Sequence, residues 1–344
     1  MRIAWFRAAV PDATDRLDDT APLVDELRRA HRIDIIVEGD AHDFVWRHVR
    51  RPWDLCVYEL DHSRAYEFIW AYLINYPGVV WMRTTDIAHL RVPLSASRCV
   101  VTSTSAAAEL LRARYPEVHV RVGGPVGSAP LPEESGADLS GPRSTRFVVF
   151  DDRTRDPEVI NRAFRRARDA GALFEVLEPG VVTGCDVVIA PGWPPSHRTP
   201  AAIIAGMAAG KTVVTMEMNA GAEWPAIDPQ TWRPRGIAGN EAPIAVTIDP
   251  RDEEHSLVLA IRRLSSDAAL RARLGEAAHA WWKAHATPAH AAAAWNQIVE
   301  EAVRLSPPPR PDDWPKQFAD DGTGLAREIL SEFALPPTDI LARS

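Results

Sequence analysis

The segment 206–212 has the sequence GMAAGKT and ends in the Gly-Lys-Thr triplet that closes phosphate-binding P-loops. A P-loop would also need a glycine at position 205, where the chain has Ala205. It would run from strand through loop to helix, whereas the hydrophobic pattern predicts a helix before Gly210 and a strand after it. The segment therefore predicts a helix that ends at a glycine, and it does not predict a triphosphate-binding loop.

Two of the 12 tryptophans, Trp193 and Trp224, fall in loops after predicted strands of the second half. Indole rings stack on the apolar faces of sugars and nucleobases, so these two side chains are candidates for ligand binding. Packing in the core or between domains is the alternative for both, and it explains most of the other tryptophans.

The histidines do not form a pattern of metal ligands. His279 and His285 lie in a predicted helical region beside Trp281 and Trp282, where we interpret them as surface or packing residues, with metal ligation as the alternative. The motifs G-x-G-x-x-G, H-E-x-x-H and G-x-S-x-G do not occur. We therefore predict no metal site and no cofactor.

The elements that must position these residues alternate between strand-like and helical runs. The first half predicts strands at 2–6, 33–38, 54–60, 78–82, 98–103 and 119–122, with helices at 21–30, 65–76 and 104–115. The second half predicts strands at 146–151, 173–177, 186–190, 212–216 and 245–248, with helices at 157–170 and 200–209. Further helices are expected at 252–264, 267–284, 289–305 and 325–333. This alternation predicts an α/β fold with parallel, doubly wound sheets.

A stretch rich in Gly, Pro and Ser separates the two halves. We predict a Rossmann-like domain at 1–123, a linker at 124–145 and a second Rossmann-like domain at 146–306. A Pro-rich joint and a return helix packing on the N-terminal domain are expected at 307–344. Because ligands bind beyond the carboxyl ends of such strands, two facing domains predict a ligand site in a shared cleft.

Charge and composition exclude some partners. A net charge of −8 argues against nucleic acid and against an anionic membrane surface as the main partner. No run of 18 apolar residues and no targeting segment is visible, so we expect a cytoplasmic protein without a transmembrane segment. Cys56, Cys99 and Cys185 lie in or beside apolar runs, which predicts buried thiols in a reducing compartment. A homo-oligomer stays possible.

Several segments together resemble bacterial family-4 glycosyltransferases of the GT-B fold. The stretch 58–90 (YELDHSRAYEFIWAYLINYPGVVWMRTTDIAHL) resembles an N-domain segment of a subgroup, and 100–124 resembles the strand–helix–strand before the linker. The stretch 185–229 (CDVVIAPGWPPSHRTPAAIIAGMAAGKTVVTMEMNAGAEWPAIDP) is similar to the nucleotide-sugar region, and 252–282 is similar to the helices that follow. The resemblance implies two Rossmann-like domains facing across a cleft, with a helical C-terminal tail.

The resemblance also implies a donor site on the second domain. Arg153 and Arg155 in FDDRTRDP correspond to the basic pair that holds the donor diphosphate, and the following helix amino terminus would assist them. The other implied donor-binding residues are Trp193, His197, Arg198, Asn219, Ala220, Gly221 and Glu223. The family's Glu-x7-Glu pair is missing, because its positions correspond to His197 (or Arg198) and Ala205.

On the acceptor side, the subgroup's His-Asp pair corresponds to Arg83 and Thr84. Asp86 and His89 are nearby candidates for a catalytic role, and His62 is a further acceptor-side candidate. The implied function is metal-independent transfer of a sugar, with retention, from a nucleotide sugar to a glycan, lipid or small-molecule acceptor. The alternatives are an inactive GT-B scaffold that binds a ligand or a partner glycosyltransferase, and a sugar-nucleotide epimerase of the same architecture.

Overall fold

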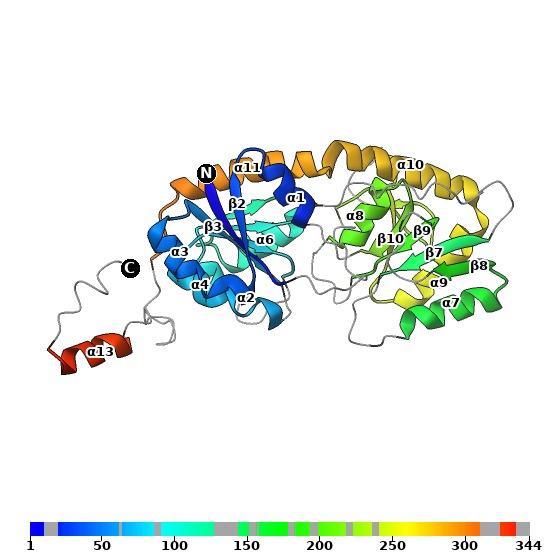
Figure 1. The fold of residues 1–344 in the computed structure, drawn as a ribbon. Coiled ribbons are helices and arrows are strands. Elements are labelled where there is room, and N and C mark those ends of the chain that lie inside the picture. The colour runs from blue at the N-terminus through cyan, green and yellow to red at the C-terminus, as the bar shows by residue number, and fades with distance from the viewer. Residues whose placement is uncertain are drawn as a thin grey trace.

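Two separate parallel sheets form the core of the protein, and a long helical segment runs along both of them (Figure 1). The computed structural model describes residues 1–9, 20–61, 64–85, 91–126, 144–150, 156, 158–177, 182, 184–192, 199–217, 223–235, 241–309 and 324–334. The predicted fold class, two doubly wound α/β sheets followed by helices, is confirmed.

The first sheet has six parallel strands in the order β2-β1-β3-β4-β5-β6. Its strands are β1 (Arg2–Phe6), β2 (Arg32–Ile36), β3 (Leu55–Leu60), β4 (Val79–Met82), β5 (Cys99–Thr102) and β6 (Val120–Val122). Its helices are α1 (Thr20–Leu27), α2 (Glu38–Ala41), α3 (Phe44–Arg50), α4 (Ile69–Asn75), α5 (Arg91–Ser95) and α6 (Ser105–Arg114), with a 3₁₀ turn at Arg64–Tyr66. The central strands are apolar almost throughout because both sheet faces are covered.

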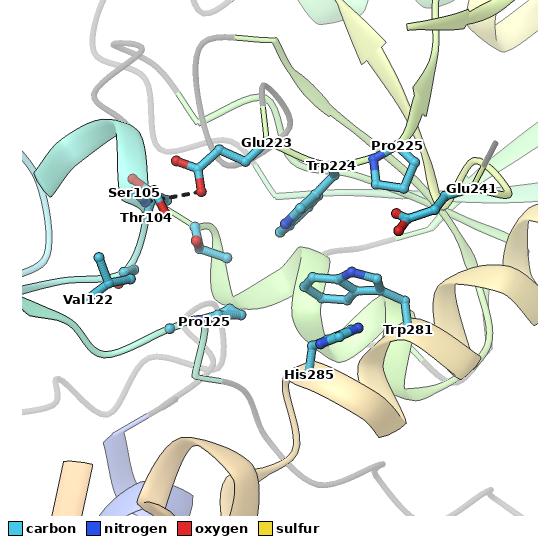
Figure 2. Close-up of a pocket in the computed structure, with 13 residues that line it drawn as sticks. Thr104, Ser105, Val122, Pro125, Glu223, Trp224, Pro225, Glu241, Trp281 and His285 are labelled. Atoms are coloured by element: carbon cyan, nitrogen blue, oxygen red, sulfur yellow. Dashed lines mark hydrogen bonds between the residues drawn. The ribbon is translucent and has the colours of Figure 1, made fainter. Parts of the chain in front are cut away.

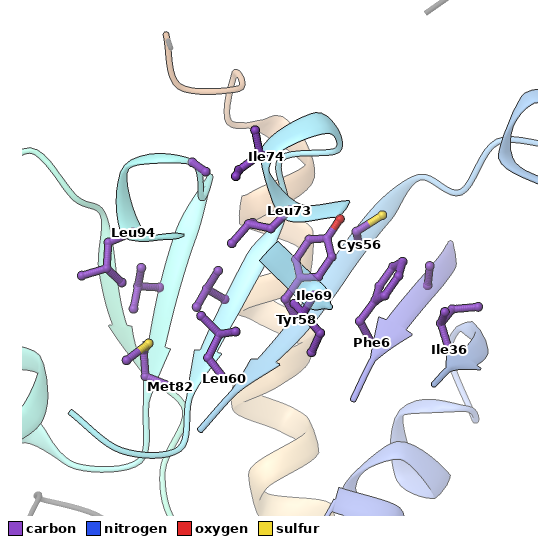
Figure 3. Packing of buried hydrophobic residues seen from close by; sticks show 14 of the residues in the cluster. Phe6, Ile36, Cys56, Tyr58, Leu60, Ile69, Leu73, Ile74, Met82 and Leu94 are labelled. Carbon is purple, nitrogen blue, oxygen red and sulfur yellow. The ribbon is translucent and has the colours of Figure 1, made fainter. Parts of the chain in front are cut away.

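One face of the first sheet packs against α3, α4, α5 and α6, around residues such as Phe6, Tyr58 and Leu73 (Figure 3). The opposite face packs against α1 and α11 (Pro288–Arg304). There, the Trp295 ring lies 5.3 Å from that of Trp5 and 5.1 Å from that of Trp81 between centroids. Although α11 lies in the range predicted for the second domain, it therefore packs on the first sheet.

The second sheet has the order β12-β11-β13-β10-β9-β7-β8 and is parallel except for the β11–β12 pair. Its strands are β7 (Thr145–Val149), β8 (Phe174–Leu177), β9 (Val187–Ile189), β10 (Thr212–Met216), β11 (Ala226–Ile227), β12 (Pro234–Arg235) and β13 (Ala245–Ile248). Helices α7 (Val159–Asp169) and α9 (Glu253–Ser266) pack on one face. Helices α8 (Ala201–Ala208) and α10 (Ala268–His285) pack on the other.

The GMAAGKT segment is a helix end followed by a strand, as predicted. Gly210 has a φ of +66°, and the amides of Gly210 and Lys211 donate back to the carbonyls of Met207 and Gly206. These two backbone hydrogen bonds form the Schellman motif, which ends helices at a glycine. Helix α10 crosses close by, since a Cβ on Gly275 would lie 2.2 Å from the carbonyl oxygen of Gly210.

Helices α7 and α9 are tied together by one carboxylate. Glu254 on α9 accepts from Arg162 at 3.0 Å and from Arg166 at 2.8 Å, both on α7. Hydrogen bonds from Arg166 and Arg162 hold the pKa of Glu254 below its ordinary value.

The helix expected at 325–333 is present as α13 (Gly324–Glu332). Ile329 on this helix and Phe333 just after it are 47% and 69% exposed, so neither is buried against the first sheet. The return to the first sheet is made earlier, where α10 gives way to α11. We therefore place the crossing between the two halves near Ala286, rather than after residue 306.

Candidate functional site

The topological switch point of the second sheet lies between β7 and β9, because β8 is the neighbour of β7 on its other side. In doubly wound sheets, ligands bind beyond the carboxyl ends of the strands at such a point. β7 ends at Val149 and β9 at Ile189, and the next strand in the sheet, β10, ends at Met216.

The predicted donor-binding residues follow these three neighbouring strands along the chain. Arg153 and Arg155 follow β7. Trp193, His197 and Arg198 follow β9, and Asn219, Ala220 and Gly221 follow β10. All eight lie outside the described residues, so their roles stay predictions. The sheet order nonetheless attaches all three segments to adjacent strands at one edge.

Glu223, the remaining donor-side candidate, reaches across to the first half of the chain. Its carboxylate oxygens accept hydrogen bonds from the backbone amides of Ser105, at 3.1 Å, and Ala106, at 2.5 Å. These are the first two residues of α6, and Thr104 Oγ1 accepts from the third amide, that of Ala107, at 3.1 Å. The first turn of α6 is thus capped partly by its own chain segment and partly by the other half of the molecule.

A pocket of about 330 Å³ opens beside this contact, between the two halves (Figure 2). The described residues that line it come from both halves: Ser103, Thr104, Ser105, Val122, Gly124, Pro125, Thr199, Glu223, Trp224, Pro225, Glu241, Trp281 and His285. The tilted rings of Trp224 and Trp281 are in contact, with centroids 5.3 Å apart, and the His285 ring lies 5.3 Å from that of Trp281.

Sequence reasoning found only part of this pocket. Trp224 was a candidate for stacking, and it does line the pocket. Trp281 and His285 were interpreted as packing or surface residues, but they also line it, whereas Trp282 is buried in the core as expected. A signal was present, because an indole and an imidazole four positions apart share one face of a helix.

On the acceptor side, the structure describes Arg83 and Thr84, of which Thr84 is buried, whereas His62, Asp86 and His89 lie outside the described residues. Arg83 follows β4, and its guanidinium lies 4.3 Å from the centroid of the Trp81 ring. Next to it in the sheet, at the end of β3, Glu59 is 2% exposed and accepts a hydrogen bond from Trp5 Nε1 at 2.7 Å.

Tyr66, in the 3₁₀ turn after β3, belongs to the same neighbourhood. Burial raises the pKa of Tyr66 to about 12, and the Glu59 carboxylate adds to the rise, while Arg83 opposes it. A carboxylate, a phenol and a guanidinium therefore interact electrostatically near the carboxyl ends of β3 and β4. Sequence reasoning missed Glu59, although it is the one charged residue within the apolar run LCVYEL.

Ala205, which the resemblance aligns with the second glutamate of the Glu-x7-Glu pair, is buried in the apolar cluster around α8. Among the residues that the structure describes, no group of three or more His, Cys, Asp or Glu side chains is placed to hold a metal ion. The three cysteines are buried free thiols, as predicted, and none of the described helices has the length and apolar character needed to cross a membrane.

No protein-family model matches the chain, and no curated protein sequence matches it either. Solved structures are similar in fold. Anabaena HepE, solved in complex with UDP-glucose, has a TM-score of 0.58 and 12% identity, covering 88% of this chain and 99% of its own. A glycosyltransferase from Rickettsia africae ESF-5 has a TM-score of 0.55 and 11% identity, covering 89% and 99%. A putative UDP-N-acetylglucosamine 2-epimerase from Listeria monocytogenes has a TM-score of 0.53 and 11% identity, covering 89% and 98%. The chain therefore has the GT-B fold found in glycosyltransferases.

Proposed function

We propose that this protein is a glycosyltransferase of the family-4 type, which moves a sugar from a nucleotide-diphosphate sugar to an acceptor, with retention and without a metal ion. The observation that carries the proposal is the attachment of the three predicted donor segments to β7, β9 and β10, beside the switch point. The GT-B fold supports it, because the two sheets of that fold face each other across a cleft.

In this proposal, the donor diphosphate binds between Arg153 and Arg155, at the end of β7. As the bond from the sugar to the phosphate oxygen breaks, negative charge develops on the diphosphate. The two guanidinium groups and the loop amides near Gly221 stabilise that charge, and this electrostatic term is commonly the largest in such reactions. Trp193, His197, Arg198, Asn219 and Ala220 complete the donor site.

The acceptor enters from the first half of the chain. Arg83 follows β4 and lies over the Trp81 ring, and its charge acts on Tyr66. Arg83 and Tyr66 orient the acceptor hydroxyl, together with His62, Asp86 and His89 from the neighbouring segments of the chain. The proton of the attacking hydroxyl leaves to the departing diphosphate, which suits a site that lacks a strong general base.

An inactive scaffold with the same fold is the second candidate, and the burial of Ala205 among apolar residues favours it. The resemblance implies a ribose beside this position, and an alanine there offers its hydroxyls no charged acceptor. Since a hydrogen bond to a charged group contributes roughly 1.5–3 kcal/mol, donor affinity should fall about tenfold to a hundredfold relative to a complete site. We therefore expect weak donor binding and slow transfer.

A thermal-shift screen against nucleoside diphosphates and their sugars tests the proposal. A ligand at about 100 times its Kd stabilises the folded state by about 2.7 kcal/mol, which is readily measured. Each hit is then incubated with an acceptor panel, and NMR identifies the products. A transferred sugar with its anomeric configuration kept supports the proposal, an epimerised nucleotide sugar indicates an epimerase, and binding without turnover indicates the scaffold.

A further inference from the structure

We propose that the pocket between the two halves binds a sugar unit without acidic groups, either neutral or carrying an amine. Its role as an acceptor subsite rests on the proposed function, whereas the binding of the sugar does not. The volume of about 330 Å³ lies at the lower end of the range of about 300–1,000 Å³ for ligand pockets, which suits a small ligand.

The aromatic wall of the pocket fits a sugar ring. The Trp224 and Trp281 rings are tilted by 58°, and the Trp281 and His285 rings by 43°, so together they form an angled surface (Figure 2). Trp224 is only 7% exposed and belongs to the apolar cluster around α8, so the core holds it in place, and the half-buried Trp281 and the exposed His285 present most of the aromatic surface. Rigid aromatic faces of this kind bury the apolar C–H face of a sugar at little entropic cost.

A hydroxyl group in the pocket lacks a partner within the described part of the chain. Thr199 Oγ1 is buried, and it makes no hydrogen bond, as donor or as acceptor, with any described residue. Thr199 directly precedes Pro200, the residue that caps α8, so its backbone is fixed by the start of that helix. A buried hydroxyl without a partner is unfavourable, and because the Oγ1 atom is closed off from solvent, it must rotate about χ1 into the pocket before a sugar hydroxyl can satisfy it.

The charge of the pocket selects against anions. Its described lining includes two carboxylates, Glu223 and Glu241, and neither lysine nor arginine. Carboxylates accept hydrogen bonds from sugar hydroxyls and attract an ammonium group, whereas they repel a phosphate or a sugar acid. The pocket is thus unsuited to the donor diphosphate, and we assign it to a sugar other than that of the donor.

The position of the pocket couples binding to the arrangement of the halves. Both chain crossings border it, since Gly124 and Pro125 begin the linker and His285 is the last residue of α10. A ligand that contacts both crossings and both halves stabilises the arrangement in which all of these contacts exist together.

The test uses the full chain without nucleotide. Binding of methyl glucoside, glucosamine and glucuronate is measured by calorimetry and saturation-transfer NMR. Thr199→Val removes the hydroxyl but keeps the shape, and we expect it to lower affinity for the neutral sugar about two- to tenfold without lowering the Tm. Thr215→Val is the matched control, because Thr215 Oγ1 is also buried without a partner but lies in β10 outside the pocket. Trp281→Ala should lower affinity further.

The proposal is supported if the neutral and amino sugars bind, glucuronate binds several-fold more weakly, and only the pocket variants lose affinity. It is overturned if glucuronate or inorganic phosphate binds as well as the neutral sugar, or if Thr199→Val binds the sugar as tightly as the Thr215→Val control does. Nucleotide binding without any sugar binding overturns the pocket but leaves the proposed function standing. Sugar binding without any nucleotide binding overturns the proposed function but leaves the sugar pocket standing.

Discussion

Replacing Glu223 with glutamine tests whether a charged contact holds the two halves of the chain together. In the structure, its carboxylate accepts from the amides of Ser105 and Ala106, the first two residues of α6. The carboxylate therefore also meets the positive end of the helix dipole. Glutamine keeps the shape and one acceptor oxygen, but it loses the charge.

The expected effect is moderate, because Glu223 is exposed. A carboxylate at an exposed helix amino terminus contributes about 0.3–1 kcal/mol, and water and salt screen it. We call molecules closed when Glu223 contacts α6 and open when it does not. Losing the charge should lower the ratio of closed to open molecules by about two- to fivefold. At 1 M salt, where charges are screened within about 3 Å, parent and variant should become similar.

A distance measurement between labels on the two halves reports this ratio. Exposed Glu67 and Arg165 can be changed to cysteine for labelling, since one precedes α4 and the other lies on α7. The native thiols should react slowly, because they are buried and burial raises the pKa of Cys56, Cys99 and Cys185 to about 12.

Glu241→Gln is the matched control for this measurement, since it removes the same charge from the same pocket. A distance distribution in Glu223→Gln that equals the parent's at low salt would refute the idea that this carboxylate holds the cleft closed. The same conclusion would follow if both variants opened the protein equally.

Three further predictions concern the scaffold. Gly275→Ala should destabilise the protein by about 1–3 kcal/mol in urea unfolding, because the new Cβ meets the backbone carbonyl of Gly210. The control Gly39→Ala, whose Cβ enters open space, should be nearly neutral. Equal effects of the two substitutions would contradict the close packing of α10 on Gly210. Trp295→Ala should cost about 3–5 kcal/mol, against less than about 0.5 for the exposed Trp46→Ala; a small loss would show that α11 does not hold the first sheet. The pKa of Glu254 is lowered in the folded protein, so its contribution to the free energy of unfolding is present above the ordinary value of 4.5 and is lost as the pH falls through the lowered value. Glu254→Gln should remove this part of the loss of stability in acid. Equal dependence of stability on pH in the parent and the variant would contradict this contribution.

Much of the fold follows from periodicity in the sequence. The strand predicted at 212–216 is β10, since buried β-branched residues between a glycine and a polar turn leave little alternative. Helix α3 was not predicted, because Phe44 is its only buried residue and Val45, Trp46 and Val49 are exposed. Without an apolar stripe, a short helix has no periodic signal.

The candidate site could be predicted only in part. Order along the chain placed the donor candidates after three strands that prove to be neighbours, because parallel strands end at one edge. The contact of Glu223 with Ser105 joins residues 118 positions apart, and it depends on how the halves meet. Local patterns carry no information on such a contact, and the same holds for the pairing of Trp224 with Trp281.

Calorimetry with nucleoside diphosphates tests the central claim most directly. The parent, Arg153→Ala and Arg155→Ala are titrated with the nucleoside diphosphates that the screen selects, with Arg165→Ala as a control for loss of one exposed positive charge. We expect weak binding by the parent and the control, and a loss of roughly tenfold or more in at least one of the other two variants, since a charge-assisted hydrogen bond contributes about 1.5–3 kcal/mol. Binding that survives both substitutions unchanged would contradict the position of the phosphate site, and an absence of binding by the parent would contradict the transferase itself.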